Sequence, residues 1–169
     1  MIAVKLSYIA KTLGWRHVGP DALVNHVVTD SRQVKSGDCF VALYGDNFDA
    51  HQFITQVLSQ GASSLIVSQE QDSALAQLVV KDTRVALGQL AALIAKLSNS
   101  KKIAITGSCG KTTVKEMLAA ISAVSNHVLS TAGNFNNDIG VPLTLLRLTQ
   151  LHDIAVIETG ANHAGEIDY

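Results

Sequence analysis

Hydrophobic residues along the 169-residue chain follow two spacings, one helical and one typical of short strands. Leu6, Ile9, Ala10 and Leu13 recur at helical intervals before Gly14, which predicts a helix that ends at the glycine. Two more helices are expected at 53–58 and at 83–97, the second capped by Thr83. Short apolar runs predict strands at 25–29, 39–43, 64–67 and 78–80, with a loop at 44–47.

After a polar stretch at 98–102, strands and helices alternate along the chain. The pattern predicts strands at 102–106, 127–130 and 153–158, and helices at 111–124 and 140–148. Such alternation is typical of a parallel sheet with crossover helices. We therefore expect an α/β protein of two parts, a small α/β domain over 1–98 and a parallel-sheet domain over 99–169.

A glycine-rich turn joins the strand at 102–106 to the following helix. Its eight residues are Thr106, Gly107, Ser108, Cys109, Gly110, Lys111, Thr112 and Thr113. Backbone N–H groups in such a turn and the helix dipole favour phosphate, so Lys111 would contact the terminal phosphates of a nucleotide and Thr112 a magnesium ion. The spacing differs from the common P-loop, which has a glycine where this chain has Ile105. The alternative is an ordinary strand-to-helix turn with a solvated lysine.

A second polar loop, at 133–140, carries Asn134, Asn136 and Asn137 between two glycines. It follows a predicted strand, and ligands bind at the carboxyl ends of parallel strands. Asparagine amides can donate to phosphate or sugar oxygens. A polar turn with an asparagine helix cap explains the residues equally well.

The strand at 153–158 ends in Glu158, and His163 lies five residues further on. An acidic residue at this point of a phosphate-binding sheet is the usual second magnesium contact. His163 could bind metal or substrate, but a lone histidine is more often a surface or capping group. Glu158 could also be a solvated strand end.

Two polar loops of the first domain are candidate substrate contacts. One holds Ser31 and Arg32, whose guanidinium can pair with phosphate. The other holds Gly45, Asp46, Asn47 and Phe48, whose ring could stack on a base. Spacing alone favours turn and capping chemistry, with Asp49 as a helix N-cap.

Composition narrows the class of protein. Hydrophobic residues make up 47% of the chain and charged residues 16%, which predicts a sizeable core. A formal net charge of −1 gives no reason to expect nucleic acid as a partner. The sequence shows neither a membrane-spanning run nor a signal peptide, and its two cysteines fit a reducing cytoplasm.

In order along the chain, these segments resemble the ATP-dependent Mur ligases of peptidoglycan synthesis. The resembling stretches are 29–32, 37–45, 48–51, 80–84, 106–113, 131–142 and 158–167. The asparagine loop and the Glu158–Ile167 segment favour the member that adds D-alanyl-D-alanine. The unusual spacing of the phosphate loop agrees with this family.

The resemblance implies a cytoplasmic enzyme of cell-wall synthesis, and through it of cell shape and division. It would use ATP and Mg²⁺ to join D-alanyl-D-alanine to UDP-N-acetylmuramoyl-tripeptide through an acyl phosphate. The first domain would bind UDP through Ser31, Arg32 and residues 45–48. In the second, Lys111, Glu158 and His163 would be catalytic, Thr112 and Glu158 would hold metal, and Asn134, Asn136, Asn137 and Asn162 would contact substrate.

Family members are much longer than this chain. Beyond this point they carry a carbamylated lysine, a second metal-binding histidine, the adenine pocket and a C-terminal domain. We therefore expect a fragment that is inactive alone, from a parent that is a monomer. Two alternatives remain, a related amide ligase such as a folate polyglutamylating enzyme, and a non-catalytic nucleotide-sugar-binding module.

Overall fold

The computed structural model describes residues 1–45 and 48–160 and confirms the predicted α/β class. The chain divides into two compact units, Ala3–Leu90 and a second made of Met1–Ile2 with the residues from Ala91 onward. Helix α3 (Thr83–Leu97) runs through the division, and the boundary at 98/99 stays a prediction. In the described ranges no helix is long and apolar enough to cross a bilayer.

The unit Ala3–Leu90 is built on a five-stranded sheet. Its order is β2 (Arg16–Val18), β9 (Ala76–Val79), β8 (Ser64–Val67), β5 (Cys39–Val41) and β4 (Val27–Val28). Strands β4, β5, β8 and β9 are parallel, whereas β2 pairs antiparallel with β9. Strand β2 was missed because its three residues, Arg-His-Val, form no apolar run.

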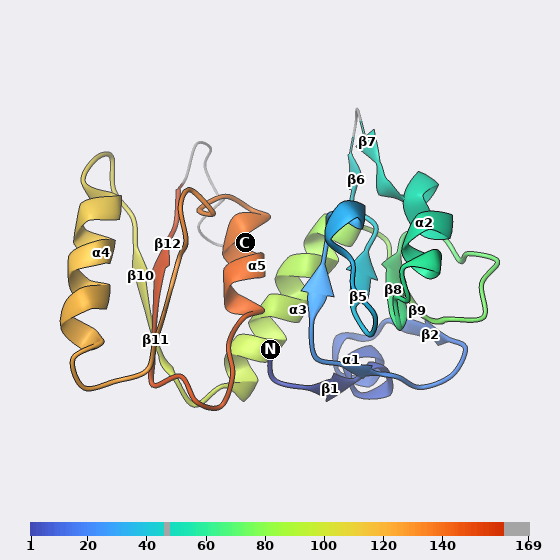
Figure 1. The fold of residues 1–169 in the computed structure, drawn as a ribbon, viewed down its shortest axis with the longest axis horizontal. Coiled ribbons are helices and arrows are strands. Elements are labelled where there is room, and N and C mark those ends of the chain that lie inside the picture. The colour runs from blue at the N-terminus through green and yellow to red at the C-terminus, as the bar shows by residue number, and fades with distance from the viewer. Residues whose placement is uncertain (46–47, 161–169) are drawn as a thin grey trace. The chain divides into compact units, whose positions relative to one another are not determined.

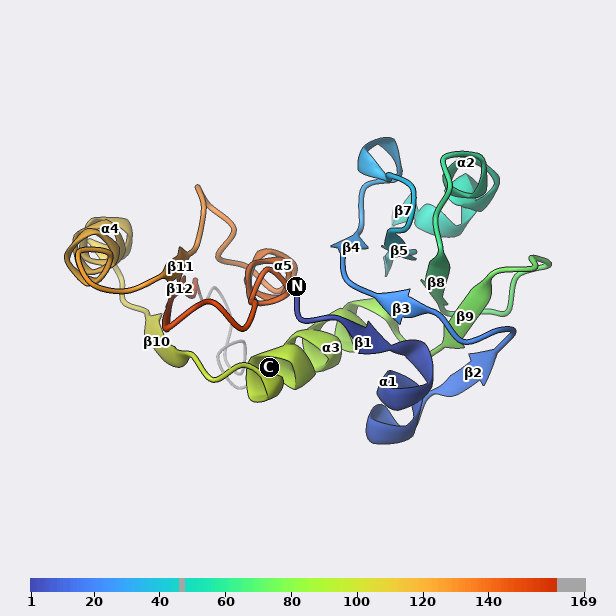
Figure 2. The same cartoon turned by 60° about the horizontal axis from the view of Figure 1, so that its bottom comes forward.

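Both faces of this sheet are buried, which explains why its central strands are apolar at successive positions. Phe40 and Leu65 belong to a cluster with residues of η2 (Ala50–Phe53) and α2 (Ile54–Ser59). The neighbouring Val41 and Ile66 are also fully buried, and side chains alternate between faces along a strand. Figure 2 shows α2 on one side of the sheet and α1 (Leu6–Leu13) with α3 on the other.

Short elements complete the unit. Strand β1 (Val4–Lys5) pairs with β3 (Leu23–Val24), and η1 (Ser31–Gln33) follows β4. The prediction of a loop over 44–47 is partly wrong, because β6 (Tyr44–Gly45) pairs antiparallel with β7 (Phe48–Asp49). A strand of two residues has no periodicity by which sequence could reveal it.

The ends of two helices test the predicted capping. Gly14 ends α1 in the left-handed region, at φ 70°, as expected. The predicted cap of α3 by Thr83 is wrong, because the Asp82 carboxylate accepts from the N–H groups of Arg84 and Val85. The Thr83 hydroxyl instead accepts from the Tyr44 N–H at 3.1 Å and so anchors the β6–β7 hairpin.

The second unit contains a parallel sheet of order β10 (Lys101–Ile105), β12 (Ile154–Glu158) and β11 (Val128–Ser130). Helices α4 (Lys111–Ser122) and α5 (Gly140–Leu145) lie on its opposite faces (Figure 1). In the strand register Ile105 is opposite Glu158, and Ser130 is opposite Val156. The glycine-rich turn, the asparagine loop and Glu158 therefore meet at one edge of the sheet.

The exposed side of α4 is unusually apolar. Val114, Met117 and Ile121 are 53%, 60% and 69% exposed, whereas Lys115 is fully buried. The predicted helix is confirmed, but these three apolar side chains do not face the sheet as they would in an ordinary amphipathic helix.

Candidate nucleotide site

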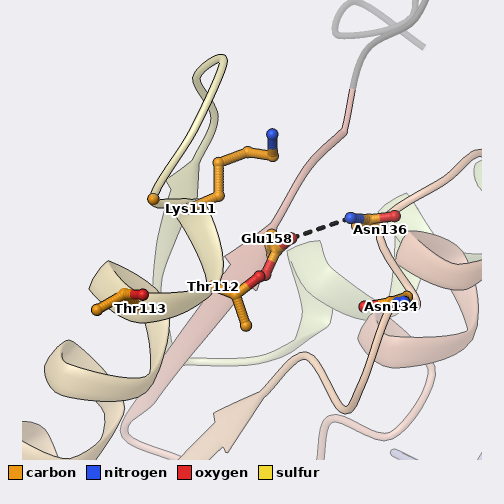
Figure 3. Close-up of a pocket in the computed structure, with 7 residues that line it drawn as sticks. Lys111, Thr112, Thr113, Asn134, Asn136 and Glu158 are labelled. Atoms are coloured by element: carbon orange, nitrogen blue, oxygen red, sulfur yellow. Dashed lines mark hydrogen bonds between the residues drawn. The ribbon is translucent and has the colours of Figure 1, made fainter.

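A cleft of about 540 Å³ lies at the carboxyl ends of the parallel strands. It is lined by residues from three segments, the start of α4, the loop after β11 and the end of β12 (Figure 3). These residues are Gly110, Lys111, Thr112, Thr113, Asn134, Asn136 and Glu158. Six of the seven carry a side chain, and every one of the seven was singled out from the sequence.

The glycine-rich turn presents the amino end of α4 to this cleft. Gly110 is the residue before the helix and adopts φ 74°, a left-handed conformation that favours glycine. In the described chain no side chain caps this twelve-residue helix. Its first N–H groups and its dipole can therefore bind an anion, and phosphate binding at this turn stays a prediction.

Lys111 lies over the turn. Its Nζ donates to the Gly107 carbonyl at 2.6 Å. A phosphate oxygen is a stronger acceptor for an ammonium than a neutral carbonyl. Lys111 can therefore exchange this bond for one to phosphate with a local movement.

Glu158 is 2% exposed at the end of β12. Its Oε1 accepts from the Asn136 amide at 2.9 Å, and its N–H donates to the Thr131 hydroxyl at 2.9 Å. Its Oε2 is buried and has no hydrogen-bond partner in the described part of the chain. A buried carboxylate with an unpartnered oxygen is costly unless a cation compensates it.

The residues of the cleft fit a magnesium ion. Thr112 and Glu158 line the same cleft and supply a hydroxyl and a carboxylate. Over residues 1–45 and 48–160 no three His, Cys, Asp or Glu side chains cluster in a way that would hold a metal. Mg²⁺ does not need such a cage, because it binds through one or two protein oxygens together with waters and phosphates.

The asparagines of the 133–140 loop have different roles. Asn136 supports Glu158 by its amide, and its main-chain oxygen accepts from the Gly160 N–H at 2.7 Å. Asn137 Oδ1 accepts from the Gly140 N–H at 2.8 Å, so the helix-cap interpretation describes this residue well. A Cβ on Gly140 would lie 2.5 Å from the Phe135 backbone, which explains the glycine. Asn134 lines the cleft.

The unit Ala3–Leu90 has a cavity of its own, of about 630 Å³. Three of the predicted substrate contacts, Ser31, Arg32 and Phe48, line it. The other lining residues are Thr29, Asp30, Phe40, Ala50, Phe53 and Gln56. Phe48 stacks on Phe53 with ring centroids 6.0 Å apart, and Gly45 is paired with Phe48 in the β6–β7 hairpin.

Asp30 holds Arg32 at the edge of this cavity. The guanidinium donates through Nε and Nη2 to the two oxygens of Asp30, at 2.9 and 2.8 Å. The Arg32 side chain and backbone lower the pKa of Asp30 to about 2. The turn-and-cap interpretation is therefore correct for Asp30, and it leaves Arg32 83% exposed with further donors unused by the pair.

Asp49 caps η2, as predicted, through the N–H of His51. Its carboxylate also contacts His51 Nδ1 at 2.6 Å, and these two hydrogen bonds lower the pKa of Asp49. His51 Nε2 accepts from the Ser68 N–H at 3.0 Å, so the histidine joins the end of β8 to η2. We assign this histidine a structural role.

Four of the predicted site residues lie outside the described residues. They are Asp46, Asn47, Asn162 and His163. Their predicted roles stay predictions.

Sequence reasoning assigned no supporting role to three residues of the two sites. Asp30 lay in a loop assigned to turn and capping chemistry, which fits the tendency of Asp to bond the backbone two residues on, but its pairing with the Arg32 guanidinium was not predicted. Lys115 and Thr131 had no such signal, since a lysine on a helix is normally solvated and a threonine after a strand is common.

Two family models match consecutive parts of the chain. The model described as Mur ligase family, catalytic domain, matches residues 23–102. The model described as Mur ligase middle domain matches residues 105–169.

Two curated relatives of similar sequence carry the same name, UDP-N-acetylmuramoyl-tripeptide–D-alanyl-D-alanine ligase. The protein of Escherichia coli K12 is 52% identical over 167 residues, which is 99% of this chain and 37% of that protein. The protein of Haemophilus influenzae is 52% identical over an alignment of 175 positions, which covers all of this chain and 38% of that protein. The chain thus spans little more than a third of the length of these relatives.

Solved structures share this fold. A UDP-N-acetylmuramoylalanyl-D-glutamyl-2,6-diaminopimelate–D-alanyl-D-alanyl ligase from Acinetobacter baumannii superposes with a TM-score of 0.90 at 47% identity, over 96% of this chain and 37% of its own. A MurF ligase from Thermotoga maritima in complex with ADP superposes with a TM-score of 0.76 at 34% identity, over 84% of this chain and 33% of that ligase.

The glycine-rich turn before α4 and the buried Glu158 line one cleft, and two models of one family match consecutive parts of the chain. The chain belongs to the Mur ligase family.

Proposed function

We propose that this chain is the N-terminal part of an ATP-dependent ligase that joins D-alanyl-D-alanine to UDP-N-acetylmuramoyl-tripeptide. The observation that carries the proposal is the buried Glu158, which lines the same cleft as the glycine-rich turn and has one carboxylate oxygen without a partner among the described residues. The names of the relatives supply the substrates. We place the reaction in the cytoplasm, where ATP is available.

The nucleotide would bind by its phosphates at the amino end of α4. Backbone N–H groups of the turn from Gly107 to Thr113 would hold the phosphate oxygens, and Lys111 would move from the Gly107 carbonyl to the terminal phosphate. Thr112 and Glu158 would hold Mg²⁺. When bound, the ion supplies positive charge that neutralises the phosphate oxygens.

The reaction is a phosphoryl transfer followed by an acyl transfer. The terminal carboxylate of the tripeptide attacks the γ-phosphate of ATP and releases ADP. The amino group of D-alanyl-D-alanine then attacks the acyl phosphate, forms the amide bond and expels phosphate. Lys111 would stabilise the negative charge that moves with the phosphoryl group, and preorganised charge of this kind usually contributes more to catalysis than any other single effect.

The cavity of the unit Ala3–Leu90 would hold the UDP end of the muramoyl-peptide. Arg32, oriented by Asp30, keeps donors free for a pyrophosphate oxygen. The exposed ring of Phe48 offers a stacking surface for uracil, and Ser31 a hydroxyl. Asn134 would approach the peptide end of the substrate, in the other unit.

The proposal is tested in the full-length protein by measuring phosphate release from Mg·ATP. We expect release only when UDP-N-acetylmuramoyl-tripeptide and D-alanyl-D-alanine are both present, with the pentapeptide product identified by mass. We expect the 169-residue chain to show no turnover.

The same assay separates the alternatives. Release that requires a folate and glutamate instead would identify a polyglutamylating enzyme. Binding of the UDP-sugar without any ATP turnover in the full-length protein would identify a non-catalytic module.

A further inference from the structure

Lys115 is a buried cation that the proposed reaction does not use. It lies on α4, three residues after Thr112, and is 0% exposed. Within residues 1–45 and 48–160 it is the one buried lysine or arginine. Burying an ammonium is costly unless it is paired, so the contacts of Lys115 indicate why it lies there.

The ammonium joins α4 to the start of the asparagine loop. Lys115 Nζ donates to the Thr131 carbonyl at 2.7 Å and to Glu116 Oε1 at 2.6 Å. The Glu116 side chain is 64% exposed and partly compensates the charge. Thr131 comes directly after β11 and is 1% exposed.

Thr131 in turn holds Glu158. Its N–H donates to the Val156 carbonyl at 3.1 Å, and its hydroxyl accepts from the Glu158 N–H at 2.9 Å. One residue is thus bound by its carbonyl to α4 and by its hydroxyl to the end of β12. The contacts form a continuous path from the helix that carries Thr112 to the strand that carries Glu158.

We propose that Lys115 is a positioning residue that fixes Thr112 and Glu158 at the separation a phosphate-bound cation requires. The inference rests on the proposed function, because it assumes that these two side chains share Mg²⁺. Thr112 and Glu158 belong to different elements, so their separation depends on how α4 is held against β11 and β12. The Lys115–Thr131–Glu158 path holds it by directional hydrogen bonds.

An apolar side chain could fill the same volume but could not provide this link. With Lys115→Met the Thr131 carbonyl would lose its ammonium donor, and α4 would keep only packing contacts with the sheet. Packing restrains the position of a helix less sharply than a charge-assisted hydrogen bond does. The other end of the path would remain intact, since the Thr131 hydroxyl is not altered.

The test compares ADP affinity with and without Mg²⁺ by calorimetry in the full-length protein. In the proposed site the glycine-rich turn would bind the phosphates of ADP without Lys115, so Lys115→Met should leave the metal-free Kd within about 3-fold of the wild type, the change expected when no ligand contact is lost. The increase in affinity on adding Mg²⁺ should fall by about 10-fold or more, as is typical when a supporting partner of a metal ligand is removed.

Two further variants separate positioning from general stability. Glu116→Gln alters the exposed partner of the same ammonium and should keep the wild-type increase in ADP affinity on adding Mg²⁺. Thr131→Val removes the hydroxyl but keeps the carbonyl, and should lose the increase as Lys115→Met does. The double variant should lose no more than either alone, because both interrupt one path.

The proposal is overturned if folded Lys115→Met shows the wild-type increase in affinity with Mg²⁺. If that variant does not fold, Thr131→Val decides in the same way from the other end of the path. Failure of the wild-type protein to bind ADP more tightly with Mg²⁺ would instead contradict the proposed function.

Discussion

Replacing Glu158 by glutamine should raise the stability of the ligand-free protein while weakening its metal-dependent binding of nucleotide. The carboxylate is 2% exposed, and among the described residues only its Oε1 has a partner, the Asn136 amide. Glutamine keeps the shape and can keep that acceptor, but it removes a charge from a buried position. A buried polar atom without a partner costs about 1–3 kcal/mol, more when charged, so we expect the free energy of unfolding to rise by about 1 kcal/mol.

With Mg·ADP bound, the wild type should instead be more stable than the Glu158→Gln variant. A ligand at 100 times its Kd stabilises the folded protein by about 2.7 kcal/mol. If Glu158→Gln weakens Mg·ADP binding 10-fold, the variant gains roughly 1.4 kcal/mol less at the same concentration. The assay is urea unfolding of the full-length protein alone, with ADP, and with ADP and Mg²⁺.

The matched control is Glu70→Gln, the same change at a surface ion pair with Arg16. It should alter stability by less than about 1 kcal/mol in all three conditions. A ligand-free Glu158→Gln protein less stable than the wild type would show that the carboxylate is satisfied in the folded state. A full Mg²⁺-linked gain in the variant would show that Glu158 holds no metal.

Three further outcomes are expected. Lys111→Ala should reduce turnover by at least about 100-fold. Binding of the UDP-sugar, measured by calorimetry, should not change, because the two ligands use different units. Loss of both turnover and UDP-sugar binding would show that the sites are misplaced. Cys109 is exposed, whereas burial raises the pKa of the Cys39 thiol to about 12. Of these two cysteines, mass spectrometry should therefore find iodoacetamide only on Cys109, and Mg·ATP should prevent the labelling. Labelling of Cys109 that Mg·ATP does not prevent and that leaves turnover unchanged would contradict this prediction. Because the folded pKa of Asp30 is about 2, below its unfolded value, its contribution to stability is present above about pH 4 and is lost as pH falls towards 2. Arg32→Gln should raise the NMR titration midpoint of Asp30, and an unmoved midpoint would show that Arg32 is not the cause.

The elements that position the nucleotide site could be predicted from the sequence. A strand, a turn with Gly107 and Gly110, and a helix follow one another locally, so no long-range information is needed. Glu158 could be placed at the same edge because parallel strands end together. This geometry explains why residues far apart in sequence were correctly grouped in one cleft.

The features that could not be predicted from the sequence are the roles of single side chains, because tertiary contacts determine them. Asp82, not Thr83, caps α3, and because both residue types are common helix caps, only the contacts of the fold show which of the two adjacent side chains turns to the helix. The exposed Met117 and the buried Lys115 reverse the usual pattern of a helix, so no rule based on hydrophobicity would have placed them.

The asparagine loop shows an intermediate case. The helix-cap interpretation fits one asparagine of the loop, whereas ligand contact by the others stays a prediction. Asn137 caps α5, while Asn134 and Asn136 line the cleft. Composition identified the loop as unusual, but only the contacts in the structure show what each asparagine does.

The central claim is that the turn from Gly107 to Thr113 and Glu158 together hold the phosphates of a magnesium nucleotide. The most direct measurement is a crystal structure of the full-length protein with Mg²⁺ and a non-hydrolysable ATP analogue. We predict phosphate oxygens on the N–H groups at the start of α4, Lys111 Nζ on the terminal phosphate, and the ion in contact with Thr112 Oγ1 and Glu158. Phosphates bound elsewhere, or an ion that contacts neither side chain, would contradict the account.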